Sequence, residues 1–342
     1  MTRNRLLAVV GIVISAVALW FAFRGLRPAE LLVTFRRANY LFVIPAACLI
    51  LADYWFRALR WRVILAPIKR NPVERLFPTL IIGFAANNVI PARVGELWRV
   101  WGLDHQEQVG KSRALATLVL ERVFDGFTLL FLLALYSLWF PLSGQARLLE
   151  YLFLLFFGAV LAGLLLLLFL EAFTLRLATF LMWPLPGRLR ERALAVIGNF
   201  ALGLHSLRNP RTLGAIVGTS LLAWLCEAGG YYALMQGFGL PLSPTHMAGA
   251  AILTLCLINL GILLPAAPGY VGTFESFGKL ALVGGFAVRE ELALGVVVLS
   301  HGLQYLLVTG LGFFFAARAG LNLLSSQPVQ SLSAEDALVP LD

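Results

Sequence analysis

Long apolar runs dominate the pattern of this chain, and several reach the roughly 20 residues that an α-helix needs to cross a bilayer. The short alternating segments typical of an outer-membrane barrel are absent from the sequence. We predict about six spanning helices, at 6–23, 40–65, 114–140, 148–170, 212–236 and 288–318. The pattern therefore predicts an all-α polytopic membrane protein.

Two further hydrophobic segments, at about 76–103 and 246–285, are interrupted near their middle. The predicted helix-breaking residues are Pro91, Gly95, Pro265 and Pro268. Pro lacks the backbone N–H and clashes with the preceding turn, while Gly permits dihedrals that other residues avoid. Limbs such as Phe77–Val89 and Ala248–Leu264 are short or marginal for a full crossing, so each segment is predicted to form a re-entrant helical hairpin.

The two interruptions are near-copies of each other. The first runs Asn87-Asn88-Val-Ile-Pro-Ala-Arg-Val-Gly-Glu96, and the second contains Pro268-Gly-Tyr-Val-Gly-Thr-Phe-Glu275. Both carry Pro-x-x-Val-Gly followed closely by a glutamate. Broken helices in corresponding positions of two halves are typical of transporters built from inverted repeats. We therefore predict a transporter-like inverted repeat in which the two hairpins enter from opposite faces.

The organisation that follows is one membrane domain at 1–324. We predict a first half at about 1–170, an interfacial linker at about 172–211, a second half at about 212–320 and a disordered tail at 325–342. The linker combines prolines with arginines separated by apolar residues. The tail is rich in Ser, Gln, Pro and acidic residues.

Composition supports the membrane prediction, because 60% of the residues are hydrophobic and only 13% are charged. The net charge of +9 does not indicate a nucleic-acid partner, since the basic residues stand at the ends of apolar segments. Cys48, Cys226 and Cys256 lie in apolar surroundings and are interpreted as packing residues. We predict no disulfide, no metal site and no cofactor.

The distribution of basic residues sets the predicted orientation in the cell membrane. Two stretches are rich in them: Arg57, Arg60, Arg62, Lys69, Arg70 and Arg75, then Arg176, Arg188, Arg190, Arg192, Arg208 and Arg211. By the positive-inside rule both termini are predicted to be cytoplasmic, with a retained N-terminal helix in place of a cleaved signal peptide. Four arginines would then lie outside, at Arg24, Arg27, Arg36 and Arg37, which an amphipathic surface segment would explain.

Charged residues inside apolar sequence mark the candidate site, because a charge at the bilayer centre costs about 2.5–3.5 kcal/mol. The predicted substrate-binding residues are Asn87, Asn88, Arg93, Glu96, Arg99, Arg122, Gly269, Gly272 and Glu275. The predicted charge-coupling residues are Glu121, Asp125 and Lys279. For several of these a structural ion-pair cluster, or an interfacial anchor in the case of Arg99, remains an alternative.

Spacing suggests specific pairs among these groups. Glu121 and Asp125 share one helical face, and Arg93 or Arg99 is an attractive counter-ion for them. Lys279 stands four residues after Glu275, in the polarity that favours an ion pair. Among the other intramembrane polar residues, Glu227, His301 and Gln304 are interpreted as isolated helix-to-helix contacts, and Asp53 with Arg57 as a local pair near the cytoplasmic interface.

The three motifs together resemble a known family. Asn-x-x-x-Pro-x-Arg-x-Gly-Glu at 87–96, Glu-Arg-x-x-Asp at 121–125 and Pro-Gly-x-x-Gly-x-x-Glu at 268–275 are similar to the flippase-like transmembrane region of lysylphosphatidylglycerol synthases. The resemblance covers about 6–320. It implies a multi-pass lipid translocase with two inverted halves, of the kind that also occurs without the lysine-transferring synthase domain.

Three functions remain open. The leading hypothesis is movement of an anionic or polyprenyl-type lipid between leaflets, with the hairpin tips meeting near the midplane. The second is an intramembrane lipid-modifying enzyme that uses Glu121 and Asp125 as acid and base, although no recognised catalytic motif is present. The third is a scaffold for a membrane-enzyme partner. The sequence specifies neither the lipid nor the oligomeric state.

Overall fold

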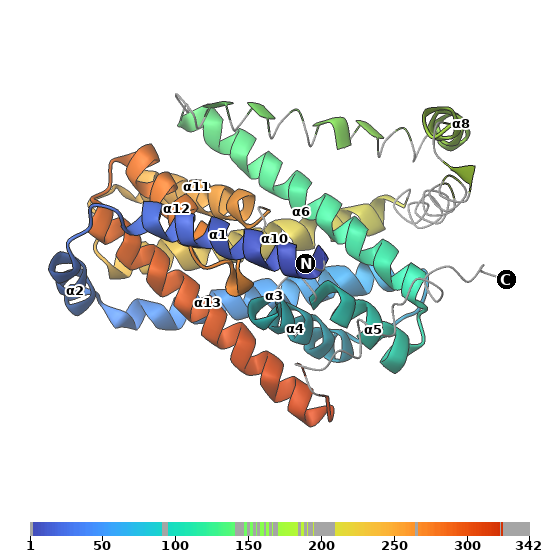
Figure 1. The fold of residues 1–342 in the computed structure, drawn as a ribbon, viewed down its shortest axis with the longest axis horizontal. Coiled ribbons are helices and arrows are strands. Elements are labelled where there is room, and N and C mark those ends of the chain that lie inside the picture. Colours follow the sequence, from blue (N-terminus) through green and yellow to red (C-terminus); the bar gives the residue numbers. More distant parts are fainter. Residues whose placement is uncertain are drawn as a thin grey trace.

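The computed structural model is a bundle of α-helices, and the part of the chain that it describes contains no β-strand (Figure 1). It describes residues 3–90, 95–140, 147–148, 151–152, 155, 158–160, 162–163, 166, 170–183, 186–187, 190, 194, 209–263, 266–321 and 323. Within these ranges the prediction of an all-α polytopic membrane protein is confirmed.

The helices follow the predicted apolar segments closely. The first half contains α1 (Arg3–Phe23), α2 (Pro28–Arg37), α3 (Val43–Leu65), α4 (Val73–Val89), α5 (Gly95–Glu107) and α6 (Lys111–Trp139). The second half contains α10 (Pro210–Gly237), α11 (Pro244–Ile262), α12 (Thr273–Lys279) and α13 (Glu290–Arg318), with α8 (Glu171–Leu181) between the halves. Shorter turns are η1 (Tyr40–Phe42), η3 (Pro268–Tyr270) and a π-helical turn after α12, η4 (Leu280–Gly284).

Local sequence fixes where α10 and α11 begin. The side chains of Asn209 and Ser243 accept hydrogen bonds from the backbone N–H groups of Arg211 and His246, and a proline follows each capping residue. An Asn or Ser cap satisfies a donor that the helix leaves free, and Pro fits the first helical position because its missing N–H is not needed there.

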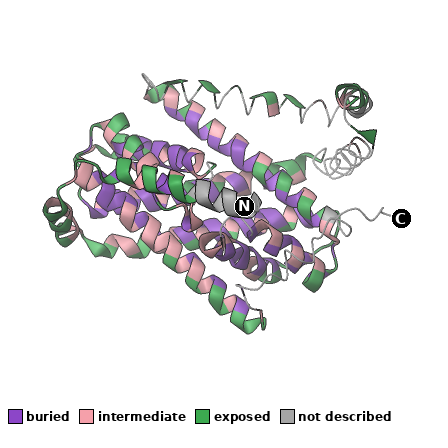
Figure 2. Ribbon diagram, viewed as in Figure 1, coloured by how far each residue is buried: buried purple, intermediate pink, exposed green. Residues whose placement is uncertain are grey.

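Among the described residues, four helical stretches are long and apolar enough to cross a membrane: Tyr40–Leu65, Pro210–Gly237, Pro244–Ile262 and Glu290–Arg318. Residues 12–23 of α1 and helix α2 form a fifth if the bend of 78° between them belongs to one span. Exposed residues colour the outer faces of the bundle and buried ones its interior (Figure 2). Large apolar side chains such as Leu138 and Leu306 are 78% and 71% exposed, as expected for a lipid-facing surface.

Three predicted segments have different outcomes. Helix α2 has no buried side chain and carries Arg36 and Arg37 in its last turn. These two arginines therefore belong to a separate surface helix. The predicted span at 148–170 and the tail at 325–342 fall mostly or wholly outside the described residues. Within the predicted linker, α8 lies at the edge of the molecule (Figure 1).

The first interrupted segment folds back on itself. A Cβ placed on Gly95 would overlap the carbonyl oxygen of Gly83, and one on Gly102 would lie 2.8 Å from the methyl group of Thr79. Later residues of α5 therefore face earlier residues of α4. The two helices form an antiparallel hairpin that depends on glycine for its close approach.

The second interrupted segment folds in the same way. Gly261 of α11 lies against Phe277 of α12, and Gly278 of α12 lies against Ile258 of α11. One prediction about its first limb is wrong: α11 has 19 residues and is long and apolar enough for a full crossing. The break therefore begins only after a complete helix.

The two halves run in opposite directions. Each consists of a helix, a hairpin and a long helix, and α3 packs antiparallel to α10, because Phe42 lies near Gly237 whereas Arg60 contacts Ser220. Each hairpin also packs on the long helix of the other half, α4 on α13 and α11 on α6. Packing of each hairpin against the other half is the arrangement of an inverted repeat, and it places both hairpin tips inside the bundle.

Candidate functional site

Both hairpin tips border one cavity of about 530 Å³. Asn87 and Asn88 line it from the end of α4, and Gly269 and Tyr270 line it from η3. The tips contact each other, since a Cβ on Gly269 would lie 3.4 Å from the carbonyl oxygen of Asn88. The depth of this contact in a bilayer stays a prediction.

The rest of the lining mixes charged groups with apolar ones. The charged side chains are Arg57 of α3, Glu96 of α5, Arg122 and Asp125 of α6 and Glu227 of α10. The apolar and aromatic ones include Phe84, Val119, Val123, Leu129, Ile262, Leu263 and Phe274. The cavity lining can therefore solvate a polar group and also contact hydrocarbon.

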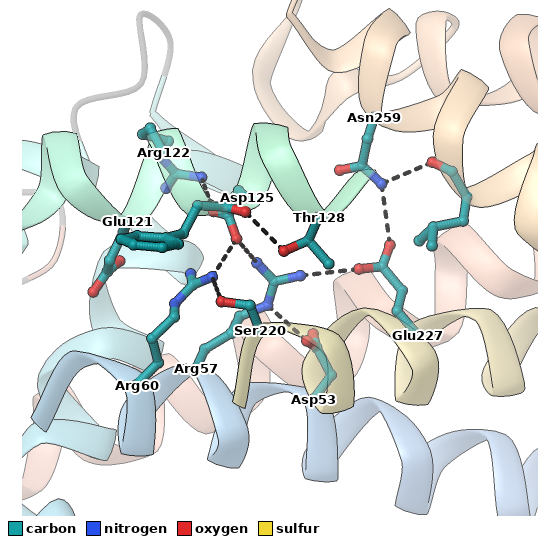
Figure 3. A network of polar contacts seen from close by, with 12 residues as sticks. Asp53, Arg57, Arg60, Glu121, Arg122, Asp125, Thr128, Ser220, Glu227 and Asn259 are labelled. Carbon is teal, nitrogen blue, oxygen red and sulfur yellow. Dashed lines mark hydrogen bonds and ion pairs between the residues drawn. The ribbon is translucent and has the colours of Figure 1, made fainter. Parts of the chain in front are cut away.

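Asp125 is the centre of the charged network (Figure 3). Its Oδ1 lies 2.7 Å from Nη1 of Arg60 and 3.6 Å from Nη1 of Arg57, and its Oδ2 lies 3.4 Å from Nη1 of Arg122. Arg60 also donates to the hydroxyl of Ser220 at 3.1 Å. One carboxylate on α6 thus joins α3 through Arg57 and Arg60, which lets these two charges stay buried, and it also contacts Arg122 of its own helix.

Arg57 extends the network towards the second half. Its Nε donates to Oδ1 of Asp53 at 2.7 Å, and its Nη2 donates to Oε2 of Glu227 at 3.1 Å. The guanidinium carbon lies 4.2 Å from the ring centre of Trp224. The prediction of a local Asp53–Arg57 pair is correct in its partners, and both side chains are buried and bonded into a larger network. Its place near the cytoplasmic interface stays a prediction.

This network holds more negative than positive groups. Its arginines are Arg57, Arg60 and Arg122, and its carboxylates are Asp53, Glu96, Asp125 and Glu227. Three positive and four negative groups leave a net charge of −1 if all are ionised. The arginines are therefore fully compensated within the protein.

Arg99 and Glu121 form a separate pair. Nη2 of Arg99 lies 2.8 Å from both carboxylate oxygens of Glu121, and the guanidinium carbon lies 4.1 Å from the ring centre of Trp61. Arg99 is thus the observed counter-ion, and at 2% exposure it is not an interfacial anchor. Glu121 is not among the residues that line the cavity, and Asp125 has different arginine partners. The pair predicted as acid and base therefore do not face one common space.

The second hairpin tip is held by Glu275 and His301. Oε2 of Glu275 accepts from the backbone N–H of Gly272 at 2.6 Å, and Oε1 lies 2.6 Å from Nδ1 of His301. Nε2 of the same imidazole lies 2.7 Å from the carbonyl oxygen of Gly269. His301 therefore connects α13 to both sides of the tip and is not an isolated contact.

The predicted pair of Glu275 with Lys279 is wrong. Nζ of Lys279 lies 2.7 Å from Oε2 of Glu290 and donates to the carbonyl oxygen of Ala22 at 3.1 Å. Glu275 stands in the first turn of α12, where its carboxylate turns back to cap the free N–H of its own helix. It is then directed away from the next turn, which carries Lys279.

We expect Glu275→Gln to weaken the second tip. The neutral amide loses charge-assisted hydrogen bonds to Gly272 and His301, each of which contributes about 1.5–3 kcal/mol. Thermal unfolding in detergent should show a lower midpoint for this variant than for Glu290→Gln, which changes a 44% exposed carboxylate. Equal midpoints for the two variants would contradict the role assigned to Glu275.

The asparagines of the first repeat bond within the protein. Oδ1 of Asn87 accepts from the backbone N–H of Gly95 at 2.8 Å, and Nδ2 of Asn88 donates to the hydroxyl of Thr309 at 3.0 Å. Glu96 contacts Nε of Arg122 at 3.3 Å. Three predicted residues, Pro91, Arg93 and Pro265, lie outside the described part of the chain.

Sequence reasoning missed that Arg57 and Arg60 belong to the site. It counted them as cytoplasmic charges, yet they are 6% and 1% exposed. Without them the first basic stretch keeps only four of its six residues, which weakens the basis of the predicted orientation. The signal in the sequence was their position within an apolar run, four and seven residues after Asp53, which places all three on one face of a helix.

Comparisons with known proteins give the chain relatives across almost its whole length. The family described as the lysylphosphatidylglycerol synthase TM region matches residues 8–312. Glycosyltransferase AglD of Haloferax volcanii is 22% identical over 351 residues, and the match covers 93% of this chain but only 56% of AglD. A UPF0104 membrane protein of Methanothermobacter thermautotrophicus is 27% identical over 333 residues, and 93% of each chain is covered.

Proposed function

The chain belongs to the family of the lysylphosphatidylglycerol synthase TM region, and from this premise we propose that it moves an anionic or polyprenyl-type lipid between the leaflets of the cell membrane. The observation that carries the proposal is a cavity of about 530 Å³ bordered by both tips of an inverted pair of broken-helix hairpins. In transporters of this architecture the substrate site lies where the repeats meet.

Arg122 is the proposed first contact of the headgroup. Its side chain is 41% exposed, and its contacts with Glu96 and Asp125, at 3.3 and 3.4 Å, are longer than the 2.7 Å contact of Arg60 with Asp125. Because it is the loosest of the three network arginines, it can exchange a carboxylate for a phosphate at the lowest cost. A guanidinium fork also matches the geometry of phosphate oxygens.

The apolar residues of the cavity lining support the same proposal. Val119, Val123 and Leu263 line the cavity beside the charged groups. A lipid that enters with its headgroup among the charges can keep its hydrocarbon chains against these residues and the surrounding bilayer. The cavity therefore has to desolvate only the headgroup.

The remaining predicted residues receive supporting roles. Glu96 and Asp125 would balance Arg122 when no headgroup is bound, and Asn87, Gly269, Gly272 and Glu275 would hold the two tips in place. Arg99 and Glu121 would fix α5 to α6. Lys279 would act at a distance from the headgroup, through Glu290. Cytoplasmic termini remain part of the proposal.

Arg122→Gln tests this assignment. In proteoliposomes, nitrobenzoxadiazole-labelled phosphatidylglycerol or a labelled polyprenyl phosphate in the inner leaflet is protected from dithionite until it is moved outwards. We expect the rate to fall about tenfold or more, because a hydrogen bond to a charged group contributes about 1.5–3 kcal/mol. The matched control is Arg318→Gln, which changes an exposed arginine at the end of α13.

Two results would contradict the proposal. One is wild-type protein that inserts normally but moves none of the labelled lipids. The other is an Arg122→Gln variant that moves them as fast as wild type and the Arg318→Gln control.

A second candidate is lipid modification, which is favoured by the name of the relative AglD, a glycosyltransferase. The chain spans only 56% of that protein, and the separate engagement of Glu121 and Asp125 argues against an acid–base pair here. Mass spectrometry of lipids incubated with the purified protein distinguishes the candidates, because only an enzyme yields a product of altered mass. A scaffold for a membrane-enzyme partner would move no lipid and alter none.

A further inference from the structure

The geometry points to a proton-binding site at the second hairpin tip. We infer that Glu275 and His301 together hold one proton between Oε1 and Nδ1, and that this proton fixes the tip to α13. The inference that it also regulates lipid movement rests on the proposed function. The bound species is thus a proton, taken up from water through the cavity that His301 lines.

The contacts of the imidazole carry the argument. Nε2 lies 2.7 Å from the carbonyl oxygen of Gly269, which can only accept a hydrogen bond. The neutral ring therefore needs its hydrogen on Nε2, and Nδ1 then has a lone pair and can only accept a hydrogen bond. Nδ1 lies 2.6 Å from Oε1 of Glu275, so a second hydrogen has to stand between these two atoms.

The conclusion does not depend on which atom carries that hydrogen. An imidazolium beside a carboxylate and a neutral imidazole beside a carboxylic acid contain the same number of protons. Oε2 of Glu275 already accepts from the N–H of Gly272 and does not need the hydrogen. In either form the pair holds one proton more than a carboxylate with a neutral histidine.

Loss of this proton would free the tip. Two lone pairs would then face each other, either between Nδ1 and Oε1 or, after a tautomer change, between Nε2 and the oxygen of Gly269. This imidazole joins the tip to α13, whereas Ala267 and Ser276 bond the tip to Ser15 and Ala18 of α1. Phe274, stacked on the imidazole with ring centres 4.2 Å apart, would lose its partner.

Other titratable groups near His301 favour keeping the proton. Tyr305 of α13 is an ionisable neighbour of the imidazole, and Tyr270 of η3 lines the same cavity. The cavity is also lined by Tyr54 of α3 and by Arg57, Glu96, Arg122, Asp125 and Glu227, which already pair with one another. With all its groups ionised, their network has the net charge of −1 counted above, which attracts a proton. An anionic headgroup would attract it more, which couples proton binding to occupancy.

Hydrogen–deuterium exchange across pH 5 to 9 tests the site without any lipid transport. The measured rates are first corrected for the pH dependence of intrinsic amide exchange, with the loop 66–72 as the reference. We then expect the exchange rate of residues 266–279 in the wild type to rise at least tenfold in one step as pH increases. His301→Gln keeps a donor but does not titrate, and it should remove the step. Glu275→Gln, which cannot share the proton, should also remove it and serves as the second variant.

Each outcome decides one part of the inference. A wild-type tip without a step, or variants that retain the same step, would overturn the proton site. A step together with lipid movement that changes over the same pH range supports it in full. A step with lipid movement that does not depend on pH overturns the coupling. A step in a wild-type protein that moves no lipid at any pH overturns the proposed function and leaves the proton site standing.

Discussion

Asp125→Asn should have the largest effect on stability, with a loss of about 3–5 kcal/mol in the free energy of unfolding. The amide leaves the buried Arg60 without its carboxylate and removes one carboxylate contact each from Arg57 and Arg122, so the cost arises mainly because the charge of Arg60 loses its compensation. Lipid movement should be lost with it, since the same carboxylate fixes the position of Arg122. Thermal or denaturant unfolding in detergent measures the first effect.

The matched control is Glu74→Gln, which changes an exposed carboxylate in the first turn of α4 and should stay within about 0.5 kcal/mol of wild type. A double variant, Asp125→Asn with Arg60→Gln, should recover part of the loss because it removes the charge that Asp125 compensated. If Asp125→Asn unfolds at the same midpoint as the control, the network does not stabilise the fold and Figure 3 describes an incidental cluster.

The second large effect is expected for Gly95→Ala. The new methyl group would overlap the carbonyl oxygen of Gly83 and lie 2.6 Å from Oδ1 of Asn87, which accepts the N–H of residue 95 itself. The hairpin can accommodate the methyl group only by separating α4 from α5. We expect a loss of about 1–3 kcal/mol or more, together with slower lipid movement, because the first tip no longer meets the second.

Gly218→Ala is the matched control for this variant. It makes the same change within α10, where an added Cβ meets nothing within 4 Å, so it should be neutral or stabilising by about 0.5–1 kcal/mol. Unfolding midpoints and the dithionite assay apply to both. Equal behaviour of Gly95→Ala and Gly218→Ala would show that close approach of α4 and α5 is not required.

The apolar pattern predicted the helices well because burial in lipid depends on composition over a whole segment. The run at 40–65 became η1 and α3, the run at 288–318 became α13, and the helices on either side of each Pro/Gly interruption pack as a hairpin. A helix in a bilayer has to satisfy its own backbone hydrogen bonds, so its existence can be read locally. The repeated Pro-x-x-Val-Gly motif also predicted where the chain reverses.

Pairing of charged groups could not be predicted in this way. The i, i+4 rule suggested Glu275 with Lys279, yet His301, 26 residues away in sequence, provides the partner. It correctly paired Arg57 with Asp53 but did not indicate Glu227, the second partner of Arg57, which lies 170 residues away. Spacing describes neighbours on one helix, but in a bundle a charge pairs with whichever helix packs against its face.

The sequence by itself determined that this is a helical membrane protein with two interrupted segments and several charges in apolar surroundings, since these properties follow from residue type and local order. Only the tertiary structure decided that α3 and α10 pack antiparallel, that the tips share one cavity, and that Asp125 receives three arginines. These depend on which helix faces meet, and a buried charge is stable only beside the partner that this meeting provides.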